Sequence, residues 1–88
     1  MMTVELTPEA ATEFRLLPAT IRIRVRKLFV RLTRWPAVSG VKSLRGNLAG
    51  HYRMRTGDYR VQFRISVSAA LTIVIVEKIG HRDGFYEE

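Results

Sequence analysis

The segment from His51 to Ile65 constrains the fold more than any other part of the chain. It reads HYRMRTGDYRVQFRI, and its apolar and polar residues alternate with a period of two on both sides of Gly57-Asp58. Such alternation predicts two half-buried strands, and the two residues between them suit a tight turn. Glycine at the first turn position favours a type II′ turn, because that position requires a positive φ. The segment therefore predicts an antiparallel β-hairpin with Gly57-Asp58 at its tip.

The register of this hairpin separates two kinds of side chain. Counting outward from the turn pairs Thr56 with Tyr59 and continues to Tyr52 with Phe63. One face then carries a set typical of a core: Tyr52, Met54, Val61, Phe63 and Ile65. The opposite face carries a polar and basic set: His51, Arg53, Arg55, Arg60, Gln62 and Arg64.

The basic face of the hairpin is a candidate binding surface. The register places Arg55 opposite Arg60, and like charges directly opposite each other destabilise a sheet. An ordinary hairpin could carry such residues as a solvated face of mobile side chains. Here four arginines and one histidine share one concave face with no carboxylate among them, so we expect the face to bind a polyanion.

The charge of the whole chain agrees with a polyanionic partner. There are 15 Lys and Arg residues against 8 Asp and Glu, which gives a formal net charge of +7. Twelve of the cations are arginines. The planar guanidinium group is favoured where bidentate contacts with phosphate or carboxylate matter.

Composition also excludes several classes of protein. We expect one domain over residues 1–88, because the chain is too short for two. With no Cys and only two His, we expect no disulfide scaffold, no metal site and no cofactor. The N-terminal residues lack the pattern of a signal peptide, and the longest apolar stretch, residues 69–76, is far below the ~20 residues that span a bilayer. We therefore expect a cytoplasmic protein with no membrane contact.

Two helices are predicted before the hairpin. A short strand over residues 2–6 is followed by a helix over 8–16, with Thr7 as N-cap and proline in the first turn. A second helix is predicted over residues 19–34. Its core stripe has helical spacing and comprises Ile21, Val25, Leu28, Leu32 and Trp35, whereas Ile23 and Val30 lie on the far side.

A loop over residues 36–48 connects the helices to the hairpin. Val41 and Leu44 are expected to anchor it to the core, while Lys42 and Arg45 add positive charge. Its glycines and asparagine are typical of irregular structure.

The last strand completes the predicted sheet. The hairpin strands are expected over about 50–56 and 59–66, and the apolar run over 71–79 is typical of a central strand. This strand is expected to leave the sheet at Gly80. The order β-α-α-β-β-β predicts an α+β fold, with a helical hairpin packed on one face of a mainly antiparallel twisted sheet.

Three motifs in this order resemble a known family. They are KSLRG at Lys42–Gly46, YRMRTGDYRV at Tyr52–Val61 and IGHRDGFY at Ile79–Tyr86. Together with the strand and two helices before them, they resemble the RelE/ParE superfamily of type II toxins over nearly the whole chain. The resemblance implies a RelE-like fold. RelE-like members cut messenger RNA without a metal, typically in the ribosomal A site, whereas ParE-like members inhibit DNA gyrase. The GHR ending followed by a tyrosine resembles the nuclease branch.

The resemblance also implies which residues form the site. The catalytic set would be Arg53, Arg55, Arg60, Arg82 and Tyr86. Nucleic-acid binding would involve Lys42, Arg45, His51, Arg64 and His81. RelE itself carries lysine where this chain has Arg53 and Arg55. Lysine can lose a proton and arginine effectively cannot, so the general base stays open. His81 could serve as base or acid, because histidine titrates near neutral pH, or it could be an ordinary loop residue.

The implied reaction is attack of the RNA 2′-hydroxyl on the adjacent phosphate, with a 2′,3′-cyclic phosphate and a 5′-hydroxyl as products. Arg60 and Arg55 would contact the non-bridging oxygens, Arg53 the backbone and Arg82 the phosphate or the leaving group. Tyr86 would stack on a base or exchange a proton.

The implied partners are messenger RNA, the ribosome and a cognate antitoxin in a toxin–antitoxin hetero-oligomer. Three alternatives stay open: a gyrase inhibitor without nuclease activity, a module that binds RNA or the ribosome without cutting, and an inactive toxin.

Overall fold

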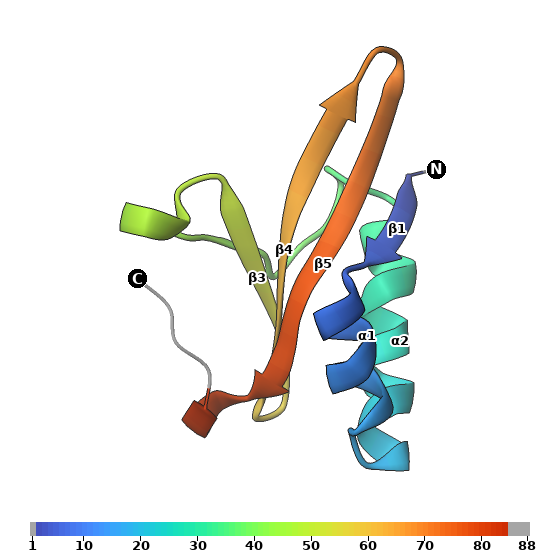
Figure 1. Cartoon of the computed structure of the whole chain (residues 1–88), viewed down its shortest axis with the longest axis vertical. Coiled ribbons are helices and arrows are strands. Elements are labelled where there is room, and N and C mark those ends of the chain that lie inside the picture. The colour runs from blue at the N-terminus through green and yellow to red at the C-terminus, as the bar shows by residue number, and fades with distance from the viewer. Residues whose placement is uncertain (1, 85–88) are drawn as a thin grey trace.

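Two helices cover one face of a five-stranded sheet in the computed structural model, which describes residues 2–84 (Figure 1). The elements are β1 (Thr3–Leu6), α1 (Pro8–Arg15), α2 (Ala19–Leu32), β2 (Lys42–Ser43), β3 (His51–Thr56), β4 (Tyr59–Ser68) and β5 (Leu71–His81), with 3₁₀ turns at Gly46–Leu48 and Arg82–Gly84. The strand order is β1-β5-β4-β3-β2, and β1 alone runs parallel to its neighbour. The predicted α+β fold is confirmed.

The first helix begins as the sequence predicts. Thr7 has an extended backbone, and its hydroxyl accepts the amide proton of Ala10 at 3.1 Å, while Pro8 occupies the first turn. This side-chain cap satisfies one of the amide groups that have no partner within the helix. Ala10 and Leu17 are buried against the sheet.

The second helix contributes the centre of the helical layer. Val25, Leu28 and Leu32 are buried, as the spacing predicts. The helix ends at Leu32, two residues before the predicted Arg34, and the chain then turns so that Trp35 packs on the hairpin. Its ring centroid lies 4.9 Å from that of Tyr52 and 5.5 Å from that of Phe63.

The hairpin has the predicted register. Every expected pair, from Thr56 with Tyr59 to Tyr52 with Phe63, is present, and Gly57 has a φ of +59°. The inner face packs under the helices, where Met54, Val61 and Phe63 are at most 1% exposed. The basic face is therefore the open face of the sheet.

The sheet extends further than predicted in three places. Within the loop predicted over residues 36–48, β2 pairs with the free edge of β3, so that Lys42 lies opposite Arg53. β4 continues to Ser68, and β5 does not leave the sheet at Gly80 but pairs through His81 with Tyr59. In each place the neighbouring strand has backbone N–H and C=O groups available for hydrogen bonds, and pairing with one more residue satisfies them. Local sequence propensity does not reveal that such a neighbour is present.

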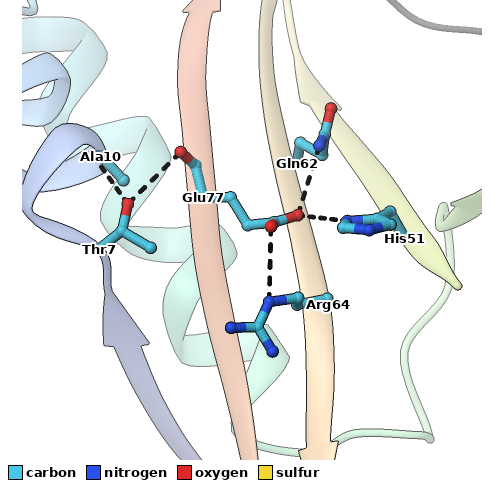
Figure 2. Close-up of polar contacts among 6 residues, drawn as sticks. All are labelled: Thr7, Ala10, His51, Gln62, Arg64 and Glu77. Carbon is cyan, nitrogen blue, oxygen red and sulfur yellow. Dashed lines mark hydrogen bonds and ion pairs between the residues drawn. The ribbon is translucent and has the colours of Figure 1, made fainter. Parts of the chain in front are cut away.

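A bulge interrupts β5 opposite the middle of β4. Gln62 pairs with Lys78 and Phe63 with Val76, so Glu77 is one extra residue. The bulge explains how Val76 and Ile79 are both buried although two residues separate them. It also directs the side chain of Glu77 to the open face, where it meets side chains of β3 and β4 (Figure 2).

Candidate nucleic-acid interface

A cleft of about 730 Å³ opens beside the edge strands of the sheet. Its lining residues come from β2, the loop after it and the hairpin: Lys42, Ser43, Leu44, Arg45, Arg53, Arg55 and Arg60. Among these described residues five are cations and none is acidic. The cleft is therefore a concentrated positive site, which attracts phosphate groups.

Strand pairing brings these cations together. The register sets Arg55 opposite Arg60 and Lys42 opposite Arg53. The Nε atoms of Arg53 and Arg60 are buried although both side chains line the cleft.

The loop after β2 is fixed to the same site. Leu44 is 5% exposed, and its amide donates to the carbonyl oxygen of His51 at 2.9 Å. This anchor holds Lys42 and Arg45 at the wall of the cleft, so five of the ten residues predicted as a site line a single hollow.

A second polar group lies on the open face around Glu77, as Figure 2 shows. Oε1 of Glu77 lies 2.5 Å from Nδ1 of His51 and accepts from the Gln62 amide at 3.3 Å. Oε2 lies 3.5 Å from Nε of Arg64. His51 and Arg64, both predicted as site residues, thus share one carboxylate. The Glu77 cluster comprises His51, Gln62, Arg64 and Glu77.

Sequence reasoning missed Glu77. The hairpin itself carries no carboxylate on its basic face, but β5 supplies one from the neighbouring strand. The only sequence signal is the break in alternation between Val76 and Ile79, where two polar residues separate two apolar ones.

The two predicted residues at the end of β5 lie near the hairpin tip. The backbone amide of Arg82 donates to the carbonyl oxygen of Asp58 at 2.8 Å. The Nε atom of the Arg82 side chain lies 3.8 Å from Oδ1 of Asp58 and 3.8 Å from Oδ1 of Asp83. Nδ1 of His81 accepts the amide proton of Asp83 at 3.2 Å, and the His81 ring stands edge-on to Tyr59. Neither residue is among the described lining of the cleft, and Tyr86 lies outside the described residues.

Two further features of residues 2–84 concern ligands and membranes. No group of three or more histidine and acidic side chains in this part of the chain is arranged to hold a metal ion. None of its helices combines the length and the apolar character needed to cross a bilayer.

Comparison with solved structures identifies the class of protein. The toxin–antitoxin complex RelBE2 from Mycobacterium tuberculosis contains a chain 33% identical to this one, with a TM-score of 0.76 over 92% of this chain and 98% of that chain. The YoeB/ParE toxin from Agrobacterium tumefaciens is 22% identical, with a TM-score of 0.77 over 91% of this chain and 98% of its own. The isolated RelE toxin of E. coli is 23% identical, with a TM-score of 0.76 over 92% and 84% of the two chains.

The chain therefore belongs to the RelE/ParE superfamily of toxins. No protein-family model and no curated protein sequence matches it.

Proposed function

We propose that this protein is the toxin of a type II toxin–antitoxin system and an endoribonuclease that cleaves messenger RNA on the ribosome. The observation that carries the proposal is the cleft in which Lys42, Arg45, Arg53, Arg55 and Arg60 converge. A site of this kind suits a reaction in which the substrate supplies its own nucleophile and the protein supplies position and charge.

The chemistry requires little else from the protein. The 2′-oxygen, the phosphorus and the 5′-oxygen must be held in line, and the negative charge that develops on the phosphorane must be stabilised. Arg60 and Arg55, opposite each other on β4 and β3, are suited to the two non-bridging oxygens. Arg53, paired with Lys42, is suited to hold the neighbouring backbone.

A non-catalytic function is the second candidate, and one observation favours it. Four of the five cations that line the cleft are arginines, and arginine cannot act as a proton acceptor at neutral pH. If all five cations keep their protons, the cleft would hold messenger RNA or ribosomal RNA without cutting it.

An antitoxin partner is part of the proposal. Solved complexes of similar fold pair RelE with RelB-type antitoxins, in E. coli and in Pyrococcus horikoshii among others. The net charge of +7 favours a partner with an acidic segment, which would cover the cleft and block RNA. Co-expression with the protein encoded next to the toxin should yield a stable complex that elutes as one species.

Primer extension on cellular transcripts after brief induction tests the nuclease assignment. Wild-type protein should produce new 5′ ends within coding regions. Arg60→Ala should reduce their formation by about 10²–10³-fold, the loss expected when one donor leaves a preorganised anion site. Arg15→Ala is the matched control, because Arg15 lies on α1, in the helical layer and outside the cleft lining. Whole transcripts in arrested wild-type cells would overturn the proposal, and accompanying DNA damage signalling would point to gyrase.

A further inference from the structure

Glu77 is an unexpected group on a surface proposed to bind RNA. Its negative charge repels RNA phosphates, so it opposes the affinity that the surrounding cations provide. The bulge in β5 nevertheless presents it on the open face, where its side chain is 22% exposed. A carboxylate in this position needs a role other than binding RNA.

The contact with Glu77 defines which ring nitrogen of His51 donates a hydrogen bond. An ionised carboxylate only accepts hydrogen bonds, so Nδ1 of His51, 2.5 Å from Oε1, carries the proton of that bond. In the neutral ring Nε2 is then the unprotonated nitrogen and can accept a proton. Gln62 and Arg64 hold the two carboxylate oxygens from β4, which fixes the orientation of the pair (Figure 2).

His51 is also adjacent to the cleft. It lies on β3 two residues from Arg53, and strand alternation places both side chains on the open face. Its carbonyl oxygen accepts the amide proton of Leu44, a residue of the cleft lining. The histidine side chain is 25% exposed, and His51 is not itself among the described residues that line the cleft.

We propose that His51, positioned by Glu77, is the general base of RNA cleavage. The inference rests on the proposed nuclease function and supplies a proton acceptor beside a cleft whose cations are four arginines and one lysine. Nε2 of His51 takes the 2′-hydroxyl proton as the O2′–P bond forms and the P–O5′ bond breaks. The departing 5′-oxygen takes a proton from water, and the hydroxide formed recovers the proton from His51. The products are the 2′,3′-cyclic phosphate and the 5′-hydroxyl end.

Charged residues lie on each strand or loop near His51. They are Arg53 on β3, Arg64 on β4, Glu77 and Lys78 on β5, and Lys42 and Arg45 from β2 and its loop. The test therefore compares the rate–pH profile between variants.

The experiment is single-turnover cleavage of a labelled messenger RNA in reconstituted ribosome complexes across the pH range in which histidine loses its proton, between about pH 5 and 8. His51→Gln keeps a polar side chain of similar reach. It should lower the maximal rate by about 10²–10⁴-fold and remove the rise of rate with pH that we expect of the wild type.

Glu77→Gln separates positioning from binding. The amide no longer fixes the histidine tautomer, so the maximal rate should fall by about 10²-fold or more. Removal of a negative charge should leave the half-saturating toxin concentration unchanged or lower it. Glu9→Gln, on α1 in the helical layer, is the matched control and should change neither quantity.

The outcomes separate the inference from the proposed function. If the wild type leaves the RNA whole, the nuclease assignment fails and the inference fails with it. If the wild type cleaves and His51→Gln cleaves within about 3-fold of it with the same pH profile, only the inference is overturned. If Glu77→Gln binds RNA more weakly than the wild type but keeps the maximal rate, the positioning role of Glu77 is overturned. Thermal unfolding of His51→Gln and Glu77→Gln checks that both variants are folded.

Discussion

The two faces of the β3–β4 hairpin share one backbone and one register but have opposite chemistry. On the inner face Met54, Val61 and Phe63 are at most 1% exposed and pack under the helices. On the open face Arg55 and Arg60 lie opposite each other at the wall of a cleft. The inner face lowers the free energy of the fold by burying apolar area, whereas the open face keeps like charges together at a cost in stability. The comparison teaches that the residues that stabilise the fold and the cations that line the cleft lie on opposite faces of one sheet.

The largest expected effect tests the inner face. Phe63→Ala removes a fully buried ring that also contacts Trp35 and Tyr52, and we expect a loss of about 3–5 kcal/mol in the free energy of unfolding. Urea denaturation followed by circular dichroism measures it. Val67→Ala is the control on the same strand, because Val67 is 70% exposed and its loss should stay within about 0.5 kcal/mol. Equal losses for both variants would contradict the assignment of the core.

The turn that joins the two faces gives a smaller effect. Gly57 has a φ of +59°, so Gly57→Ala should cost about 1–2 kcal/mol in unfolding free energy. The same denaturation measurement applies. Gly57→Asn should cost less than the alanine variant, because asparagine tolerates this backbone conformation better. If the Gly57→Ala variant were as stable as the wild type, the positive φ assigned to this turn position would be wrong.

The smallest effect on stability has the opposite sign. Arg55→Thr removes one of two cations that face each other across the strands, and we expect the protein to become more stable by about 0.2–1 kcal/mol. A gain in unfolding free energy together with weaker RNA binding would sharpen the contrast between the faces. A loss of stability would show that the arginine pair is not a cost to the fold.

The same variant should change the salt dependence of RNA binding. Each cation that neutralises a phosphate releases about one counterion, so Arg55→Thr should reduce the slope of log affinity against log salt by about 1. Fluorescence anisotropy with a short single-stranded RNA at several salt concentrations measures the slope. Arg15→Ala, outside the cleft lining, should leave the slope as it is in the wild type.

The sequence by itself determined the elements whose signals are local. Alternation around Gly57-Asp58 specified the hairpin and its register, and the Thr7 cap with proline in the first turn specified the start of α1. Helical spacing identified Val25, Leu28 and Leu32 as core residues. The turn and the helix cap depend on contacts between residues that are close in sequence. The face that each residue occupies follows from the period of the apolar pattern, which is two in a strand and 3.6 in a helix. Three of the five cations that line the cleft, Arg53, Arg55 and Arg60, lie on this hairpin, and its register places them on one face.

Only the tertiary structure decided how distant strands meet. The pairing of β2 with β3, the extension of β5 to His81 and the bulge at Glu77 depend on backbone groups that a neighbouring strand leaves available. The contact between His51 and Glu77 joins residues 26 positions apart, and Arg82 meets Asp58 at the hairpin tip. No local pattern specifies such pairs, because a one-residue shift between two strands changes every partner while leaving the propensity of each strand the same.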